Sequence, residues 1–533
     1  MSADTTDRAD RIRAYLLDVG FTADGVLARL GSAAFAALGR GLAVPVRRAL
    51  AQPPTGSEPS TATPLDRTIA LFLLGDPIPG DDLPAGVVDD LAALGLVRAD
   101  AEHVTPVVEV HPYGESDTDW YLVSDLGAPT APDHVLGAGG ASVTLARITP
   151  RRDVGRALDL GCGSGVQALH AARHATRVVG TDTNPRALAM SALSAALSGV
   201  PTEQLDLREG SLFGPVADER FDLIVSNPPF VISPSHQFTY RDAGLPGDEL
   251  SRLVVRGAAA HLARGGMAAI LGNWLHVSGQ DWADRVSEWV QGTGVSAWIV
   301  QRETQPVADY SATWLRDAGV PEGPEFDAAM ERWLDAFDDE DCEAVGFGWV
   351  VLVAPPGPGG SAGDPGTGRD SGGEGRGSGA AGDAGEPEPE ARLAWLHVED
   401  LSHAERLPRG DEVLAFLAGC GRVEDLPAPA MLAAPARLAD GATVTTTTHV
   451  AGGAHVDAPP QLGLAGVVGP GGWRSAVTIH PTLLAALLAG ADTPIGERLD
   501  AAAQAEGLDP LDVLGPALMG LRELVRLGIV RTD

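Results

Sequence analysis

The sequence contains no lysine, so all 38 of its cationic residues are arginine, and 72 acidic residues outnumber them. The formal net charge is therefore −34 over 533 residues. A chain this acidic repels a phosphate backbone or an anionic lipid surface. This charge argues against non-specific nucleic-acid or membrane binding as the main activity, although it is compatible with a local basic site.

Cysteine and long apolar runs are also scarce. The three cysteines, Cys162, Cys342 and Cys420, are odd in number and far apart, which fits neither a disulfide framework nor a zinc site with paired ligands. We therefore expect a reducing compartment and no metal. No stretch of about 18 apolar residues occurs, and residues 1–20 are too polar for a signal peptide. We expect a cytoplasmic protein without membrane association.

Composition divides the chain into parts, and at one domain per ~100–200 residues the length predicts three or four domains. Residues 355–390 alternate Gly, Pro, Ser, Ala and acids without an aromatic or branched aliphatic residue, so we predict a disordered insertion. Strand-like runs at 345–354 and 392–399 flank it. They indicate a long loop at the edge of one sheet, with a linker between separate domains as the alternative.

Residues 106–354 are predicted to form the main α/β domain. From residue 156 onward, short β-rich runs alternate with Ala-rich helical stretches, a pattern typical of a mostly parallel sheet. The expected strands cover residues 156–160, 177–181, 204–208, 221–225, 266–271, 296–302 and 346–353. Seven strands make one Rossmann-like, doubly wound domain.

The two ends of the chain share a short pattern. Residues 94–100 and 527–533 both read Leu-Gly, a branched pair, Arg, a small residue and Asp, and both follow a helical stretch. A helix followed by a short strand is how winged-helix units finish, so we predict small winged-helix-like modules at 1–105 and 391–533. The alternative is two unrelated helices that each stop at a glycine.

The most informative stretch is residues 156–182, RALDLGCGSGVQALHAARHATRVVGTD. An apolar strand ends at Asp159, and the turn that follows contains Gly161, Gly163 and Gly165. Glycine lets the backbone approach a ligand closely, and the next helix offers free N–H groups at its N-terminus. Asp182 follows the second strand, where an acid suits the two hydroxyls of a ribose. The pattern predicts a nucleoside site.

A nicotinamide dinucleotide is a weaker interpretation of the same turn. The dinucleotide fingerprint G-x-G-x-x-G would require glycine at position 166, which is Val166, while Gly165 gives G-x-G-x-G instead. A turn in which the glycines serve only the backbone is the remaining structural alternative. A second motif elsewhere in the chain is needed to decide between a nucleoside site, a dinucleotide site and a purely structural turn.

The sequence FDLIVSNPPF supplies this second motif, because Asn227, Pro228, Pro229 and Phe230 follow the fourth strand, beside the first. The two prolines remove N–H donors and fix φ, which leaves the Pro228 carbonyl and the Asn227 side-chain oxygen as acceptors in a rigid turn. Two acceptors aimed at one point grip an NH₂ group. Phe230 adds a flat apolar face for stacking.

Together these motifs resemble class I S-adenosylmethionine-dependent N-methyltransferases of the N-P-P-[YF] branch. That branch includes glutamine methyltransferases of release factors, ribosomal RNA guanine-N2 methyltransferases and adenine-N6 methyltransferases. The resemblance covers roughly residues 135–354. It implies that S-adenosylmethionine is the cofactor and that the substrate is a planar NH₂ group of a macromolecule.

The resemblance also implies roles for the motif residues. Asp159 and the three glycines would hold the methionine part of the cofactor, and Asp182 its ribose. Asn227 and Pro228 would bind the target amino group in the turn that Pro229 stiffens, with Phe230 stacked on its plane. Hydrogen bonds to both N–H groups favour a more tetrahedral nitrogen aimed at the methyl group. The sulfonium is already activated, so no nucleophilic side chain is needed, and Cys162 is expected to be a small buried filler.

One position departs from the family pattern. The family often carries Asp after the third strand, where it reaches adenine, but here the sequence is Gly210-Ser211-Leu212-Phe213. Either Ser211 or Glu209 is expected to meet adenine. Residues 136–145, LGAGGASVTL, resemble the segment that the family places over the cofactor, with an ordinary Gly-rich loop as the alternative.

The stretch after Phe230 is predicted to form a substrate lid. It contains His236, Tyr240 and Arg241 and leads to a helix that we expect Asp248 to cap. Asn273 and Trp274, after the fifth strand, are further candidates for the pocket, with a packed Trp as the alternative.

The resemblance places the substrate in the translation apparatus, as either a protein or ribosomal RNA. Residues 1–100 contain nine Arg and thirteen acids, and the helix expected at 85–94 carries Asp89 and Asp90 and no cation. We therefore expect protein-docking terminal modules and slightly favour a protein glutamine. An RNA base, a non-catalytic S-adenosylmethionine sensor and a nicotinamide oxidoreductase are the alternatives.

Overall fold

The computed structural model describes residues 2–52, 62–114, 118–127, 131–234, 245–356, 395–404, 406–449, 461–468 and 477–532. Most of the predicted insertion, residues 357–390, lies outside these ranges, as do the predicted lid residues His236, Tyr240 and Arg241. By internal contacts the chain forms two compact units. The first comprises Met1–Ala146, Arg152–Trp289 and Glu303–Val351; the second comprises Arg147–Arg151, Val290–Arg302 and Leu352–Asp533.

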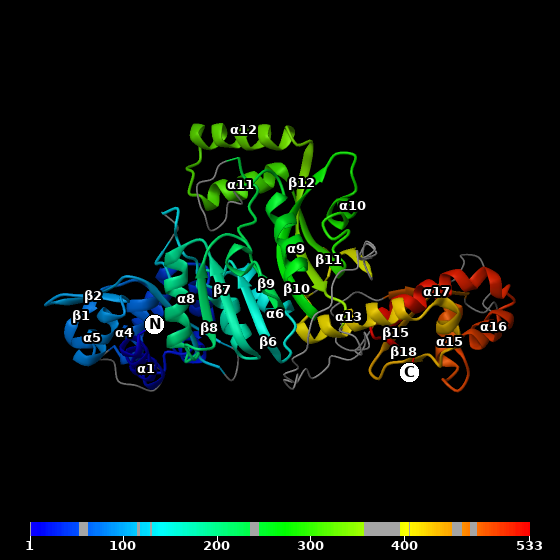
Figure 1. Ribbon diagram of the computed structural model, residues 1–533, viewed down its shortest axis with the longest axis horizontal. Coiled ribbons are helices and arrows are strands. Elements are labelled where there is room, and N and C mark those ends of the chain that lie inside the picture. The colour runs from blue at the N-terminus through cyan, green and yellow to red at the C-terminus, as the bar shows by residue number, and fades with distance from the viewer. Residues whose placement is uncertain are drawn as a thin grey trace, which may run out of the picture. The chain divides into compact units, whose positions relative to one another are not determined.

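The largest sheet has the strand order β13-β11-β12-β10-β9-β6-β7-β8 (Figure 1). Its strands in chain order are β6 Val154–Leu160, β7 Ala175–Asp182, β8 Leu205–Glu209, β9 Phe221–Ser226, β10 Leu262–Val277, β11 Ser296–Pro306, β12 Cys342–Val353 and β13 Leu396–Asp400. The pairs β6–β7, β6–β9, β7–β8, β9–β10 and β11–β13 are parallel. The expected mostly parallel α/β sheet is confirmed.

The predicted count of seven strands is wrong, because this sheet has eight. All seven expected strands are present, and β13 adds the eighth by pairing parallel with β11, from Ala297 opposite Leu396 to Gln301 opposite Asp400. Strand β13 follows the predicted insertion in the chain. Both flanks of that segment, β12 and β13, therefore contribute strands to one sheet.

Helices and short elements complete the α/β part of the chain. They are β4 Glu109–Tyr113, β5 Trp120–Ser124, α6 Gly140–Ile148, α7 Val166–Ala172, α8 Pro185–Leu197, η2 Gly214–Val216, α9 Glu249–His261, α10 Trp282–Ser287, α11 Val307–Asp317 and α12 Pro324–Asp338. The central strands read as nearly continuous apolar runs because helices cover parallel sheets on both faces. In β10, ten successive residues are buried.

The N-terminal segment is helical and ends in a small antiparallel sheet. Its elements are α1 Ala3–Asp18, α2 Ala23–Leu38, α3 Ala43–Leu50, α4 Pro64–Leu73, β1 Ile78–Pro79, η1 Gly80–Asp82, α5 Ala85–Ala93, β2 Val97–Ala99 and β3 His103–Pro106. The sheet order is β1-β3-β2, with both pairs antiparallel. Helix α5 stops before Gly95, whose φ of 73° suits the left-handed turn into β2. Helix α5 thus leads into the short antiparallel pair of β2 and β3, and the winged-helix-like character of this segment stays a prediction.

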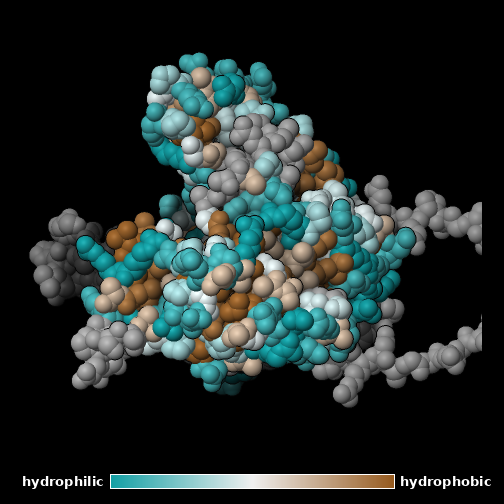
Figure 2. Space-filling view, turned by 90° about the vertical axis from the view of Figure 1, so that its left-hand side faces the viewer, coloured by the Kyte–Doolittle hydropathy of each residue, from teal (hydrophilic) through white to brown (hydrophobic). Residues whose placement is uncertain are grey.

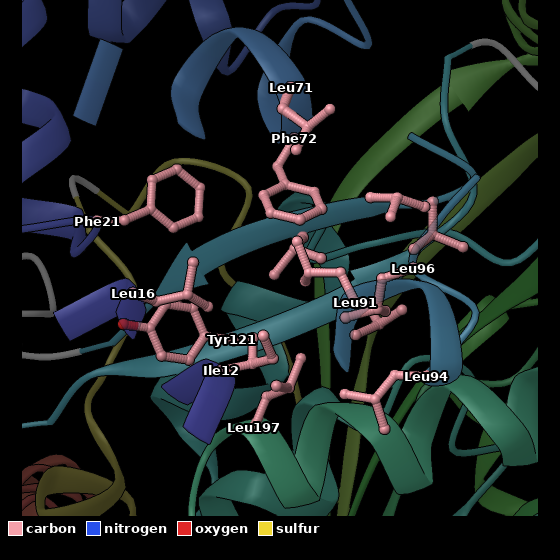
Figure 3. Packing of buried hydrophobic residues seen from close by; sticks show 14 of the residues in the cluster. Ile12, Leu16, Phe21, Leu71, Phe72, Leu91, Leu94, Leu96, Tyr121 and Leu197 are labelled. Atoms are coloured by element: carbon pink, nitrogen blue, oxygen red, sulfur yellow. The ribbon is translucent and has the colours of Figure 1, made fainter. Parts of the chain in front are cut away.

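The N-terminal helices share a hydrophobic core with the α/β part of the first unit. Figure 3 shows Ile12 and Leu16 of α1 facing Tyr121 of β5 and Leu197 of α8. All four are completely buried. Ser194 of α8 and Ser198, which directly follows this helix, also accept hydrogen bonds from the Val123 and Tyr121 amides, respectively. Helix α8 is therefore a structural element of both parts.

Asp90 of α5 is not the surface charge that the sequence suggests. It is buried and accepts hydrogen bonds from Arg8 at 2.8 Å and from Arg11 at 2.7 and 2.8 Å. The hydrogen bond from Arg11 lowers the pKa of Asp90. The carboxylate ties α1 to α5, and of the two acids on this helix only Asp89 is exposed.

Asp248 likewise has a different role from the one expected. It occupies the N-cap position of α9 but makes no side-chain capping bond. Its carboxylate accepts instead from the Leu275 amide at 3.0 Å and pairs with Arg285 at 2.8 Å. The buried acid therefore connects the start of α9 to β10 and α10.

The second unit contains a helical core with short strands. After β13 its elements are α13 Gly410–Asp425, α14 Ala428–Ala433, β14 Arg437–Leu438, β15 Thr443–His449, β16 Gln461–Val468, β17 Val477–Ile479, α15 Pro481–Leu488, α16 Ile495–Ala505, α17 Pro510–Arg526 and β18 Val530–Arg531. Helix α17 is followed by Gly528, with φ of 68°, and β18 then pairs antiparallel with β14.

The described residues were also searched for helices that could span a membrane. No single helix is long and apolar enough, and α1 and α2 pass the same test only as a pair bent by 44°.

We expect Leu197→Ala to destabilise the first unit by about 2–5 kcal/mol, because truncation leaves a cavity in the core that α8 shares with α1. The same substitution at Leu42, which is 50% exposed, should change the unfolding free energy by no more than about 0.5 kcal/mol. Urea unfolding of both variants measures this difference. Equal effects would show that α8 is not a shared core element.

Candidate functional site

The glycine-rich turn connects β6 to α7, and its three glycines adopt backbone conformations that favour glycine. Gly161, Gly163 and Gly165 have φ values of 74°, 52° and 90°, a region that strains L-residues. A Cβ on Gly165 would also lie 2.6 Å from the Ser191 hydroxyl oxygen. The chain thus turns tightly and presents backbone N–H groups at the start of α7.

Asp159, at the end of β6, is almost completely buried. One carboxylate oxygen accepts a hydrogen bond from the Ala168 amide of α7 at 2.8 Å. Burial raises the pKa of Asp159 to about 7, repulsion from Asp182 adds to this shift, and the Ala168 bond opposes it. The residue fixes the strand to the helix and holds a carboxyl group that changes charge near neutral pH.

Asp182 ends β7 and lies against the same turn. Its two carboxylate oxygens accept from the Gly163 amide and the Asn184 amide, each at 2.9 Å. Burial raises the pKa of Asp182, and these backbone hydrogen bonds act against the rise. The carboxylate is therefore held in one orientation before any ligand is present.

Asn227 follows β9 and is oriented by a residue that the sequence reasoning missed. Its Nδ2 donates to the Ser142 hydroxyl at 3.3 Å, while its Oδ1 is buried and has no hydrogen-bond partner among the described residues. Ser142 is fixed in turn, because its carbonyl accepts from Gln167 Nε2 at 2.8 Å. Ser142 lies in the 136–145 segment singled out above, but nothing in the sequence identifies it as the partner of Asn227.

The other residues of the N-P-P-F motif occupy different surroundings. Pro228 is buried and Pro229 is half-buried, and both line the large cavity described next. Phe230 is half-buried and is not among the residues that line this cavity. The structure thus brings Asn227, Pro228 and Pro229 together at one wall.

A cavity of about 740 Å³, here called the large cavity, joins the motif residues. Asp159, Gly161, Gly163 and Asp182 line it together with Asn227, Pro228 and Pro229, whereas Gly165 does not. The volume lies within the ~300–1,000 Å³ typical of small-molecule sites. Motifs that are up to 70 residues apart in the chain therefore face one space at the carboxyl ends of β6, β7 and β9.

The wall beside β8 contains only one of the two adenine candidates. Ser211 lines the large cavity, whereas Glu209 is exposed and does not. Leu212, next to Ser211, adopts a φ of 48°, which is uncommon for a residue with a side chain. That local strain turns the chain around the cavity wall after β8.

The 136–142 segment forms another wall of the large cavity, and hydrogen bonds hold the residues just before it in place. Leu136, Gly137 and residues 139–142 line the cavity. Before them, the Val135 amide donates to Asp125 at 2.8 Å, and Asp125 pairs with Arg186 of α8. The Asn184 side chain also donates to the Asp133 carbonyl at 2.8 Å. Residues just after Asp182 therefore hold this wall in place.

Cys162 lies inside the glycine turn and is buried. Burial raises the pKa of the Cys162 thiol, so the group is protonated at neutral pH. A protonated thiol is a poor nucleophile. This environment agrees with the expected filler role.

The chain beyond Phe230 is anchored by a tyrosine that no sequence signal indicated. The Ile232 amide donates to the Tyr310 hydroxyl at 2.8 Å, and Asn273 Nδ2 donates to the same oxygen at 3.3 Å. Tyr310 is fully buried in α11. Neither Asn273 nor Trp274 lines the large cavity, and Trp274 packs against Trp282 with ring centroids 5.7 Å apart.

Comparison with known proteins finds family models that match two segments of the chain. Residues 139–276 match the model of the methyltransferase small domain, and residues 18–107 match a domain of unknown function (DUF7059). A release factor glutamine methyltransferase from Geobacter sulfurreducens is 39% identical over 123 residues, which are 20% of this chain and 42% of the relative. A ribosomal RNA small subunit methyltransferase C from Escherichia coli is 31% identical over 173 residues, 31% of this chain and 46% of the relative.

These matches span less than half the length of each relative. Among solved structures, a Thermus thermophilus 16S rRNA N2 methyltransferase in complex with AdoMet and guanosine aligns with a TM-score of 0.27 at 17% identity, covering 51% of this chain and 61% of that one. The matched segment 139–276 includes the glycine turn, Asp182 and the N-P-P-F motif. Residues 139–276 therefore match the model of the methyltransferase small domain and are similar in sequence to part of a release factor glutamine methyltransferase and of a ribosomal RNA small subunit methyltransferase.

Proposed function

We propose that this protein is an S-adenosylmethionine-dependent N-methyltransferase that acts on a planar NH₂ group of a macromolecule. The observation that carries the proposal is the buried Asn227 Oδ1, an acceptor without a partner among the described residues, in a wall of the large cavity. Buried polar groups without a partner are rare and costly. A ligand that donates an N–H group at this point removes the cost.

The residues of the large cavity fit the proposed donor. The N–H groups of the glycine turn and the start of α7 suit its carboxylate, and ionised Asp159 suits its ammonium group. Asp182 and Ser211 both line the cavity; Asp182 would accept from the ribose hydroxyls, and the Ser211 hydroxyl would bond to adenine. When bound, the donor supplies a methyl group already activated on a sulfonium.

The acceptor side supplies orientation rather than a nucleophile. The Asn227 side-chain oxygen and the Pro228 carbonyl would each accept one N–H bond, with the target plane resting against the Pro-Pro turn. Stacking of the target on Phe230, which does not line the large cavity, stays a prediction. Such bonds aim the nitrogen lone pair at the methyl group and stabilise the charge that grows on nitrogen. The methylated nitrogen then loses its proton to water.

The relatives leave two substrate classes, a glutamine of a translation protein and an RNA base. We favour the protein glutamine because the chain carries a net charge of −34, which opposes phosphate binding. The longer sequence match, to the ribosomal RNA relative, favours a ribosomal RNA base as the second candidate, and guanine-N2 and adenine-N6 are the two atoms that we propose for that case. The terminal modules are proposed to dock protein partners, and the proposed location is the cytoplasm.

The first test measures donor binding and methyl transfer separately. Calorimetry should detect S-adenosylhomocysteine binding to the wild type, and labelled S-adenosylmethionine should transfer its methyl group to a component of a cell extract. We expect Asn227→Ala to lower transfer by at least ~100-fold, in line with the loss of one transition-state hydrogen bond in a buried site, and to leave calorimetric binding within a few-fold. Donor binding without any transfer would indicate a sensor rather than an enzyme.

The second prediction concerns Ser142, which positions Asn227. Ser142→Ala removes the hydroxyl that accepts from Asn227 Nδ2, so the amide is free to rotate and kcat should fall by roughly 10-fold. Ser142→Thr retains a hydroxyl and should restore much of the rate. Initial rates at saturating donor measure the effect. An unchanged rate in the alanine variant would show that Ser142 does not position Asn227 for the reaction.

The third prediction is a pH dependence of donor affinity. Because burial raises the pKa of Asp159 to about 7, the carboxyl is protonated below that pH and must lose its proton to pair with an ammonium group. Affinity for S-adenosylhomocysteine should therefore increase from pH 6 to pH 8, with the midpoint near ~7. Calorimetry on Asp159→Asn should give weaker binding without this transition. A pH profile shared by both proteins would contradict the assignment.

A further inference from the structure

A second cavity of about 240 Å³, here called the small cavity, lies just beyond the N-P-P-F motif in the first unit. Its lining comes from the chain after the motif, the segment before α9, β10 and the end of α12. Leu245 lines both this cavity and the large one. The two spaces are therefore neighbours that share a wall.

The floor of the small cavity is apolar and firmly packed. Ile232, Leu275 and Phe337 line it and are buried. All three belong to the hydrophobic cluster around Tyr310, whose hydroxyl also accepts from the Ile232 amide at 2.8 Å. A preformed apolar cavity of this size suits one aliphatic or aromatic side chain, the kind of anchor that dominates protein interfaces.

The edge of the small cavity is acidic. Glu340 lines the small cavity. This residue belongs to a set of exposed acids at and just after the end of α12, here called the acidic rim: Asp335, Asp338, Asp339, Glu340 and Asp341. No ion pair forms on these five residues within the part of the chain that the structure describes. The outer surface of this region, at the top of Figure 2, is mostly hydrophilic.

The charge extends along the whole helical hairpin that carries the rim. Residues 307–341, which include α11 and α12, contain two Arg and eleven acids, a net charge of −9. A phosphate backbone that approached the large cavity from this side would meet strong repulsion. A cationic peptide would be attracted, and its encounter with the site would be faster.

The spacing of the two cavities limits which substrate residue reaches the small one. Ile232 is five positions after Asn227, so the two residues are at most about 17 Å apart even along extended chain. A peptide whose target amide lies at Asn227 therefore reaches the small cavity within roughly five positions of that target.

We propose that the small cavity and the acidic rim bind a basic protein segment that carries an apolar side chain within about five positions of the methylated residue. The proposal rests on the proposed function, because the target amide is placed at Asn227. The apolar side chain fills the small cavity, and neighbouring Arg or Lys side chains pair with the rim. The substrate class is thus a cationic protein segment rather than RNA.

Fluorescence anisotropy with defined probes tests this proposal in the presence of S-adenosylhomocysteine. The main probe is a short arginine-rich peptide with one glutamine and leucines about four positions to either side. Comparison probes replace the leucines by serine, replace the arginines by glutamate, or consist of a short RNA hairpin. We expect the main peptide to bind at least ~10-fold more tightly than any comparison probe, with an affinity that falls as salt rises.

Three variants of the full chain test whether the main peptide binds at the small cavity and the acidic rim. Ala336→Phe fills the small cavity and Glu340→Lys reverses one charge of the rim, and each should weaken binding of the main peptide by ~5-fold or more. Asp327→Lys makes the same charge change near the other end of α12 and is the matched control, with an expected effect below ~2-fold. Calorimetric binding of S-adenosylhomocysteine should be unchanged in all three.

Tight binding of the RNA hairpin, or equal losses in Glu340→Lys and Asp327→Lys, would overturn the proposal. These outcomes are distinct from failure of the proposed function. If the wild type bound no S-adenosylhomocysteine, the methyltransferase assignment would fail, whereas normal donor binding with no preference for the main peptide would reject only the small cavity as a substrate site.

Discussion

The proposed chemistry of the first unit depends on one buried acceptor, Asn227 Oδ1, which has no hydrogen-bond partner among the described residues. Burying a carbonyl oxygen without a partner costs about 1–3 kcal/mol, and Asn227 Oδ1 is in that state. The Pro-Pro turn fixes the backbone beside it, and Ser142 holds the amide nitrogen at 3.3 Å. The fold therefore stores a preorganised hydrogen-bonding position, which is the property that a clamp for an NH₂ group requires.

Helix α8 links this site to the N-terminal helices. At its start, Asn184 and Arg186 hold the segment that walls the large cavity, and at its end, Leu197 enters the core built with α1. Packing of the N-terminal part and the geometry of the large cavity thus share one rigid element. Residues of the segment that matches DUF7059 belong to the same hydrophobic cluster as Leu197 of α8, which lies in the segment that matches the methyltransferase small domain.

Local patterns were enough to predict seven of the eight strands of the largest sheet and the motif residues at their ends. Glycine spacing and apolar runs depend on neighbours in the chain, so Asp159, Asp182 and Asn227 were identified from the sequence, and they line one cavity. The orienting contacts join residues far apart, as in Ser142 with Asn227 or Tyr310 with Ile232, and no short pattern encodes them. Asp90 was misjudged for the same reason, because its partners lie on α1.

We propose that the large cavity holds a methyl donor beside Asn227 Oδ1, an acceptor without a hydrogen-bond partner among the described residues. A crystal structure of the protein with S-adenosylhomocysteine tests it most directly. We expect electron density for the ligand between the glycine turn and Asp182, with its sulfur facing Asn227 and with Asn227 Oδ1 still without a protein partner. Density for the ligand elsewhere, or an Asn227 side chain turned into contact with the protein, would contradict it.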